Sequence, residues 1–356
     1  MRLPTREEFN RLANLFGLPV EEVALIALNR YGLQTQMTDE RIRFVLRLQS
    51  GEEFYFAVCV NTGPTPFSLR PSGEIWLGDS IFGHVVRLER DTCDSTYFRR
   101  HGTELTVNSN SRSLCVGCAF CGTYSLAAED QEALTTSAKL KQYFRSLMLR
   151  EGLRDFSHVI RTTICTGCFQ DEMAIVDHIL MVYDVIANLG FHGRMRYIGA
   201  QLGISGLRTL ARRLSTFSIS YTVECFTERD RLLHPLKSIT SSESICLILR
   251  EAQGLGFGAN FLYVLGLEEL EVVKAGFLEF SRNVNRFPVI QILQRYTHNR
   301  LDCATATAQN FEYFLSARKM LEAIFAGCLL RPRIWENYRG LWYHTYRGRK
   351  LDCVRM

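Results

Sequence analysis

The chain has 356 residues, of which 47% are hydrophobic and 22% charged, as is typical of one large globular domain with or without a smaller companion. The net charge of +5 is spread without a block of like charges, which argues against nucleic-acid binding. The absence of any run of about 18 apolar residues excludes a membrane-spanning helix. The opening residues MRLPTREEFNRL lack the apolar segment of a signal peptide. The twelve cysteines are therefore expected in a reducing cytoplasm, where thiols serve metals or catalysis more often than disulfides.

Residues 1–102 are expected to form a small α+β region. Helical spacing covers 1–35 with a break at 17–19, and Thr5 with Glu8 matches a capping box. Alternating apolar residues over 42–48 and 54–60 predict a β-hairpin, with weaker strands near 75–77 and 85–88. The helix pair can be interpreted as a DNA-binding helix-turn-helix, but its exposed positions mix Glu with Arg, which favours a scaffold or partner surface.

Short β-branched runs alternate with helical stretches over residues 103–300. Six strands are expected, at 104–109, 158–164, 194–200, 217–224, 257–265 and 287–293. Helices are indicated over 171–189 and after a capping box of Thr240 and Glu243. The alternation predicts parallel βαβ units, and six strands are too few for a closed eight-stranded barrel. The expected fold class is α/β, a partial (βα)6 TIM-like barrel with its chemistry at the carboxyl ends of the strands.

Residues 301–356 are expected to cap this barrel. A last helix over 307–328 leads into the aromatic and basic tail RPRIWENYRGLWYHTYRGRK. The aromatic side chains of the tail could stack on nucleic-acid bases, but we favour a cap over the open side of the barrel, with arginine stems lying on apolar surface.

Three cysteines, Cys115, Cys118 and Cys121, follow the first of the six strands at intervals of three residues. One interpretation is a buried helix face, although Gly117 and Gly122 count against a regular helix. A second is zinc, which takes four ligands in structural sites. A third is an iron–sulfur cluster of four irons, in which three thiolates leave one iron with an open coordination position.

On these residues the chain resembles the radical S-adenosylmethionine (SAM) superfamily. The usual spacing there is C-x3-C-x2-C with an aromatic residue before the third cysteine, whereas this chain has the shorter C-x2-C-x2-C, with Phe120 in the aromatic position. The resemblance implies that Cys115, Cys118 and Cys121 hold a [4Fe-4S] cluster whose fourth iron is chelated by SAM.

Three further segments are similar to cofactor-binding segments of that superfamily, in the same order along the barrel. TGCFQDE follows the second strand, where a Gly-Gly-Glu-Pro-like segment binds the methionyl amine, and YTVECFTERDR ends the fourth strand, where a polar residue reaches the ribose or the methionyl part. YVLGLEE resembles the adenine-contacting G-x-I-x-G-x-x-E, except that Leu262 replaces the first glycine. The cofactor-binding residues implied by the resemblance are Phe120, Thr166, Gly167, Cys168, Glu224, Arg229, Arg231, Val264, Gly266 and Glu269.

The resemblance also implies the chemistry. An electron, supplied by a donor such as flavodoxin or ferredoxin, passes through the cluster and cleaves SAM to methionine and a 5′-deoxyadenosyl radical, which abstracts hydrogen from a substrate. The catalytic candidates are Gln291 and Tyr296 as substrate contacts and Cys225 as a hydrogen donor to a product radical. Weaker substrate candidates are Tyr197, Gln201, Gln294 and His298. Cys165 and Cys168 could form a redox pair or bind an auxiliary cluster, but ordinary buried cysteines are favoured.

The sequence thus predicts a radical SAM enzyme acting on a small polar metabolite or biosynthetic intermediate. Modification of RNA or a peptide is the alternative among enzymes. Outside enzymes, the alternative is a zinc- or cluster-binding barrel that performs no radical step.

Overall fold

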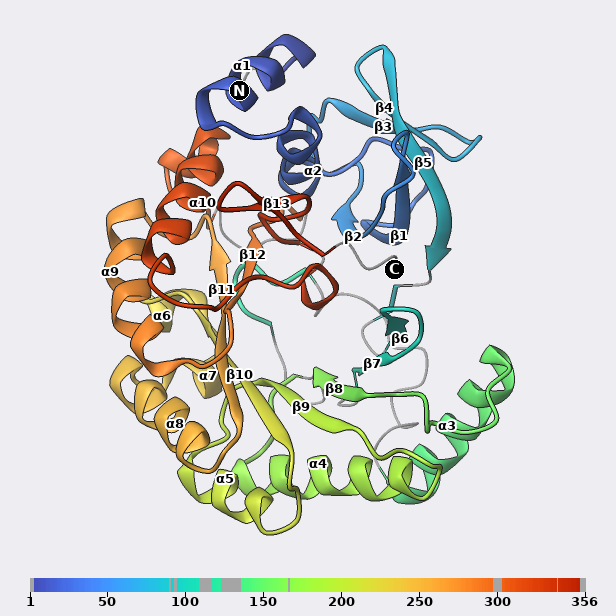
Figure 1. The fold of residues 1–356 in the computed structure, drawn as a ribbon, viewed down its shortest axis with the longest axis vertical. Helices are drawn as coiled ribbons and strands as arrows, with labels where there is room; N and C mark the ends of the chain where they lie inside the picture. Colours follow the sequence, from blue (N-terminus) through green and yellow to red (C-terminus); the bar gives the residue numbers. More distant parts are fainter. Residues whose placement is uncertain are drawn as a thin grey trace.

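One curled sheet of seven strands forms a half-barrel (Figure 1). The computed structural model describes residues 3–89, 91–92, 95–108, 117–122, 136–165, 167–296, 303–337 and 339–352. The strand order is β12-β11-β10-β9-β8-β7-β6; neighbours from β7 to β12 run parallel, and β6 (Thr96–Arg99) is antiparallel to β7. The parallel strands are β7 (Glu104–Val107), β8 (Arg161–Cys165), β9 (Arg194–Gly199), β10 (Phe217–Glu224), β11 (Gly258–Leu265) and β12 (Val289–Ile292). The predicted strands of residues 103–300 are confirmed, with ends that differ by up to three residues.

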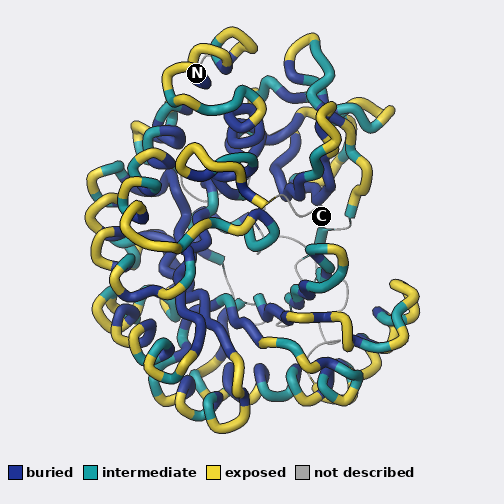
Figure 2. The backbone as a smooth tube through the Cα atoms, viewed as in Figure 1, coloured by how far each residue is buried: buried dark blue, intermediate teal, exposed yellow. Residues whose placement is uncertain are grey.

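Helices follow these strands and cover the outer face of the sheet (Figure 1). They are α3 (Ser137–Glu151), α4 (Glu172–Ala187), α5 (Ile204–Ala211), α8 (Ser242–Gly254), α9 (Leu270–Phe280) and α10 (Glu312–Ile324), with the short α6 (Arg229–Leu232) and α7 (Pro235–Ser238) between β10 and α8. Figure 2 shows the strands buried and the outer surfaces of the helices exposed. Because side chains alternate along a strand, one set packs under the helices and the other points into the half-barrel.

The inner face of the sheet is polar on one side and apolar on the other. In β9 and β10, Arg196 donates to the Ser220 hydroxyl, with 2.6 Å from Nη2 to Oγ. In β11 and β12, Leu262, Val264 and Val289 instead belong to an apolar cluster that also contains the cysteine loop after β7. The interior therefore offers both polar and apolar surfaces to a ligand.

The N-terminal region has two helices and a five-stranded antiparallel sheet, which contains the predicted hairpin and both weaker strands as well as a strand, β3, that was not predicted. Thr5 caps α1 (Arg6–Phe16) by accepting from the Glu8 N–H at 3.3 Å, and α2 (Val20–Tyr31) begins after Pro19. The sheet order is β2-β1-β5-β4-β3, which comprises β1 (Arg41–Leu48), β2 (Glu53–Cys59), β3 (Phe67–Leu69), β4 (Glu74–Leu77) and β5 (Ser80–Glu89). Nine consecutive residues of α2 are buried, so this helix is a core element rather than an exposed recognition helix.

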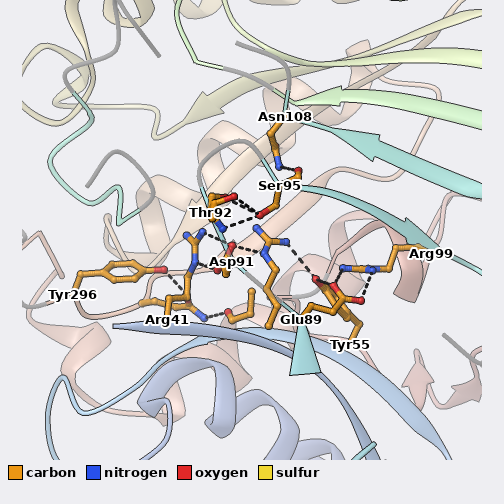
Figure 3. Close-up of polar contacts among 12 residues, drawn as sticks. Arg41, Tyr55, Glu89, Asp91, Thr92, Ser95, Arg99, Asn108 and Tyr296 are labelled. Carbon is orange, nitrogen blue, oxygen red and sulfur yellow. Dashed lines mark hydrogen bonds and ion pairs between the residues drawn. The ribbon is translucent and has the colours of Figure 1, made fainter. Parts of the chain in front are cut away.

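The N-terminal sheet fills the gap between the two ends of the half-barrel. On the β6 side, the rings of Tyr55 and Tyr97 stack with centroids 6.1 Å apart, and Arg99 pairs with Glu89 at 3.1 Å. On the β12 side, Gln294 donates to the Ala57 carbonyl at 2.7 Å. Between them, Asp91 binds arginines of β1, and Tyr296 points toward Arg41 (Figure 3).

The aromatic tail also closes the open side, along the free edge of β12. The Ile292 N–H donates to the Arg339 carbonyl at 2.8 Å. Trp342, Tyr343 and Tyr346 are buried in the core, where Trp342 contacts the ring of Phe287 at 5.2 Å. Most of the surface of these three side chains is thus occupied by packing. The tail continues into a small hairpin, β13 (Thr345–Tyr346) and β14 (Arg349–Lys350).

One predicted helix start is wrong. The N-cap of α8 is Ser241, which accepts from the Ser244 N–H at 3.2 Å, rather than Thr240 paired with Glu243. The helix begins one residue later than predicted because the hydroxyl of Ser241 can cap a helix as well as that of Thr240. In the described part of the chain, no single helix is long and apolar enough to cross a membrane. The helices α1 and α2 have that length and composition only when they are taken together, as a pair bent by 115°.

Candidate functional site

Three neighbouring strands end in backbone of positive φ. The angle is +68° at Gln201 after β9, +65° at Glu224 at the end of β10 and +113° at Gly266 after β11. This region is strained for Gln and Glu, and glycine tolerates it. A Cβ on Gly266 would also lie 3.1 Å from the Cβ of Leu293. Backbone strain concentrates at functional sites, so the carboxyl ends of β9, β10 and β11 mark the candidate site.

Cys118 and Cys121 lie on the loop after β7, at this same edge of the sheet. Residues 117–122 form turns rather than a helix, which removes the helix-face interpretation for that part of the motif. The Cys121 N–H donates to the Cys118 carbonyl at 3.0 Å, and the Ala119 N–H donates to the Leu232 carbonyl of α6 at 2.9 Å. Cys118 is 6% exposed, and Phe120 packs with it in the apolar cluster. The loop is therefore held against the connection that follows β10.

An ion pair between Glu224 and Lys237 lies beside Cys118. Lys237 Nζ is 3.0 and 3.1 Å from the two carboxylate oxygens, and Glu224 Oε2 is 3.8 Å from Cys118 Sγ. The His234 N–H also donates to Cys118 Sγ at 3.4 Å. Burial raises the pKa of the Cys118 thiol to about 12, against the opposing effect of Lys237. Without a metal or other cation, Cys118 is therefore a protonated thiol at neutral pH.

Lys237 is the positive charge of the site, although its side chain is only 14% exposed. Burial alone would lower the pKa of Lys237, but the Glu224 carboxylate, followed by Cys118, Cys168 and Cys121, raises it well above its ordinary value. The ammonium group therefore remains charged and is placed to offset negative charge on these sulfurs.

The segment after β8 is fixed by Gln201. Its side chain accepts from the Phe169 N–H at 3.1 Å and donates to the Phe169 carbonyl at 3.0 Å. Cys168 is buried next to this clamp, and Gly167 is half-buried. Gln201, a weaker substrate candidate, thus holds the main chain of the predicted cofactor-binding segment. Thr166 lies outside the described residues.

The two arginines predicted to bind the cofactor have other partners. Arg229 donates to the carbonyls of Val223 at 2.7 Å and Cys225 at 3.0 Å, and to that of Lys237 at 3.0 Å. Arg231 is half-exposed and pairs with Glu228 on the surface. Arg229 therefore holds the main chain of the β10 connection, and Arg231 forms a surface ion pair.

After β11 the two adjacent glutamates point in different directions. Glu269, the residue of the adenine-like segment, accepts from the hydroxyls of Thr305 and Thr307 at the surface. Glu268 is buried and accepts from the Phe226 N–H at 2.9 Å and the Tyr263 hydroxyl at 2.7 Å. Val264 faces the interior cluster with Cys118. Glu268 thus ties β11 to the β10 connection.

The three catalytic candidates occupy different environments. Cys225 is fully buried in the apolar cluster, and burial, followed by the nearby Glu268, raises the pKa of its thiol. Gln291 is half-buried on the inner face, opposite Ile290 and Ile292 as its alternation predicted. Tyr296 is buried, and its hydroxyl donates to Gln294 Oε1 at 2.8 Å.

The remaining substrate candidates are tied to the protein itself. Tyr197 points to the outer face and donates to the Ala200 carbonyl at 3.1 Å. Gln294 binds the N-terminal sheet. His298 lies outside the described residues.

The two described thiols of the cysteine loop have the chemistry of metal ligands. Among the residues that the structure describes, no three Cys, His, Asp or Glu side chains gather closely enough to hold a metal ion. Cys115 lies outside the described residues, whereas Cys118 and Cys121 supply the soft sulfur donors that iron–sulfur clusters and zinc take. Three thiolates from this loop would make a cluster site with Lys237 as the neighbouring positive charge.

Two site residues, Lys237 and Glu268, were missed from the sequence. Lys237 follows Glu224 by thirteen residues across two short helices, a spacing that carries no periodic signal. Glu268 stands next to Glu269, and the motif register favoured the latter. Only the observed turn after β11 distinguishes the buried from the exposed carboxylate.

Comparisons with known proteins give only a weak structural likeness. No protein-family model matches the sequence, and no curated protein matches it. A structure of Streptococcus suis SuiB bound to the precursor peptide SuiA is 13% identical, with a TM-score of 0.38, over 56% of this chain and 42% of that one. A structure of SuiB bound to S-adenosylmethionine is 11% identical, with a TM-score of 0.39, over 60% of this chain and 47% of that one. The matched part is less than half of SuiB, and a likeness of this size assigns no family.

Proposed function

We propose that the chain is a radical SAM enzyme whose curled sheet serves as the partial (βα)6 barrel of that superfamily. Cys115, Cys118 and Cys121 would hold a [4Fe-4S] cluster. The observation that carries the proposal is the position of Cys118 and Cys121, which lie at the carboxyl edge of a parallel half-barrel beside a buried carboxylate–ammonium pair. Active sites of α/β barrels lie at this edge.

The ion pair offers complementary groups to the amino-acid part of SAM. Glu224, for which the resemblance implies contact with the ribose or the methionyl part, would bind the methionyl ammonium, and Lys237 would bind the methionyl carboxylate. When bound, the cluster and SAM supply a radical strong enough to abstract hydrogen from carbon. Lys237 would also offset the negative charge of the thiolates, because it lies among Cys118, Cys121 and Cys168.

Substrate would enter from the side where Gln291 faces the interior. Its amide has no side-chain partner among the described residues, so it is available to a polar ligand. Cys225 is the proposed hydrogen donor to a product radical. Burial keeps it as the protonated thiol, which is the form that carries the transferable hydrogen.

Metal analysis after anaerobic reconstitution tests the proposal. We expect about four irons and four sulfides per chain in the unmodified protein, a much lower content in Cys118→Ala, and an unchanged content in Cys328→Ala, because Cys328 is exposed and distant in sequence. A single tightly bound zinc, or iron retained in full by Cys118→Ala, would overturn the proposal in favour of the binding-protein alternative.

The substrate class is tested separately. Formation of 5′-deoxyadenosine with reduced flavodoxin or ferredoxin is measured against small polar metabolites, a peptide library and RNA. A peptide, the ligand named for one SuiB structure, corresponds to the alternative already stated. We keep the small polar metabolite as the leading substrate because Gln291 presents one amide in a partly apolar interior. Stimulation by peptides alone would replace it.

A further inference from the structure

A cavity of about 450 Å³ opens at the amino ends of the parallel strands. It is bounded by the segment that leads into β12, by Arg100 before β7, and by residues 329–337 of the tail. Because parallel strands have their amino ends at one edge, this cavity lies at the opposite edge from the cysteine loop after β7. It is therefore separate from the candidate site.

The cavity wall carries more positive than negative charge. Its arginines are Arg100, Arg286, Arg331 and Arg333, whereas its acidic residues are Glu336 and Asp352. Glu336 pairs with Arg161 and Arg196 deeper in the half-barrel, at 2.6 and 3.2 Å, and with Arg333 of the wall at 3.3 Å. The acidic residues therefore leave a positive surplus on the wall.

Two donors on this wall lack acceptors within the described residues. Arg286 lies across Gly258, where a Cβ would be only 2.1 Å from Arg286 Nε, and none of the described residues forms an ion pair or side-chain hydrogen bond with it. Trp335 Nε1 is buried with no hydrogen-bond partner. Burial lowers the pKa of Arg286, and Arg161 and Arg333 add to that effect against Glu336. An anion in the cavity would neutralise the Arg286 guanidinium.

The same cavity has aromatic walls. Phe287 and Trp342 meet edge-to-face with ring centroids 5.2 Å apart, and both line the cavity together with Trp335. The ring of Trp335 is itself covered by Arg100, whose Cζ lies 4.6 Å from its centroid. A flat apolar group on the ligand would gain contact area against these rings.

We propose that this cavity is a binding site for a small aromatic anion, whose phosphate or carboxylate group is held by Arg286 and whose ring packs against Phe287 and Trp342. The proposal does not rest on the radical SAM assignment, because it uses none of the cysteines or their neighbours.

Titration calorimetry of the full chain with four probes tests this site: phenyl phosphate, benzoate, inorganic phosphate and benzyl alcohol. We expect saturable binding of phenyl phosphate, benzoate or both, which identifies the head group, and binding at least tenfold weaker for the two probes that lack the ring or the charge. Two of the three tryptophans line the cavity, so ligand binding should also quench tryptophan fluorescence.

Two variants assign the site. Arg286→Gln should weaken binding at least tenfold. Arg212→Gln is the matched control, because Arg212 is an exposed arginine that does not line the cavity. Circular dichroism checks that each variant is folded. No saturable binding of either aromatic anion, equal losses in Arg286→Gln and Arg212→Gln, or inorganic phosphate binding as tightly as phenyl phosphate would each overturn the proposal.

Discussion

The ring of Tyr296 lies directly against Gly122, the residue that follows Cys121. A Cβ at position 122 would be 2.3 Å from Tyr296 Cε1. Tyr296 is 5% exposed, and its hydroxyl donates to Gln294, which in turn binds the main chain of β2. The N-terminal sheet therefore fixes the cysteine loop through the residues that follow β12. Tyr296 has a clear positioning role in this contact.

We expect Gly122→Ala to lower the free energy of unfolding by about 1–3 kcal/mol, because the added methyl group overpacks a buried contact. Urea denaturation measures the change. Gly327→Ala is the control, since a Cβ there would meet nothing within 4 Å, and its effect should stay within about 0.5 kcal/mol. Equal stability of the two variants would show that the ring and the loop do not meet as described.

Asp91 makes the stability of the protein depend on acid pH. Its side chain is 2% exposed and binds Arg41 and Arg43, with 2.5 Å from Arg43 Nε to Oδ1. Burial alone would raise the pKa of Asp91, but Arg43 and Arg41 lower it to about 2 from 3.8. Because the pKa of Asp91 is lower in the folded protein, its ionised carboxylate stabilises the fold above pH 4. This contribution to the free energy of unfolding, about 2 kcal/mol for a shift of this size, is lost as the pH falls toward 2.

Asp91→Asn should accordingly cost about 3 kcal/mol at pH 7, because two buried arginines lose their counter-charge. The difference from the unmodified protein should shrink between pH 4 and pH 2, which denaturant titrations across that range measure. Asp184→Asn, in an exposed pair with Arg213, is the control and should change stability by less than about 1 kcal/mol. A difference for Asp91→Asn that is constant with pH would contradict the ion-pair interpretation.

Glu224 and Lys237 should be energetically coupled. Lys237→Met leaves a buried carboxylate unpaired, and Glu224→Gln leaves a buried ammonium unpaired. The stability lost in the double variant should therefore be smaller than the sum of the losses in the two single variants. We expect a coupling energy of about 1–3 kcal/mol from a double-mutant cycle of unfolding free energies. The exposed Lys274, replaced by Met, should show none with Glu224→Gln. Additive losses at Glu224 and Lys237 would remove the pair from the site.

The course of the chain could be predicted from local pattern. The strands β7 to β12 were located because their apolar residues either alternate or run together between turn residues, as the burial of Phe217–Glu224 and Gly258–Leu265 reflects. The hairpin of β1 and β2 followed from the same alternation. These signals are local, so tertiary contacts did not need to be known.

The site could be predicted only where its residues follow strand ends. Glu224 and Gly266 were found in that way, and both adopt the positive φ that marks the site. The partners of Arg229 are main-chain carbonyls, whose direction depends on how the β10 connection folds, and no sequence pattern contains that information. The same holds for the N-terminal sheet, whose contact with Tyr296 joins residues more than two hundred positions apart.

Replacing Cys225 by alanine should separate cofactor cleavage from product formation. Cys225 is fully buried near Cys118 in the apolar cluster, and burial keeps its thiol protonated. If it donates hydrogen to a product radical, Cys225→Ala should still form 5′-deoxyadenosine at a similar rate, while the yield of finished product per 5′-deoxyadenosine falls at least tenfold. Chromatography of both products measures the ratio.

Cys246→Ala is the matched control for this measurement. Cys246 is also a buried cysteine, but it lies in α8 within the core under the sheet, so its replacement removes the same atoms from a different place. Both variants should lose about 1 kcal/mol of stability from the cavity, which keeps folding effects equal. An unchanged product ratio in Cys225→Ala, or an equal fall in both variants, would show that Cys225 serves only in packing. Among the described candidates, Gln291 would then be the interior residue that can contact a substrate without losing a described partner.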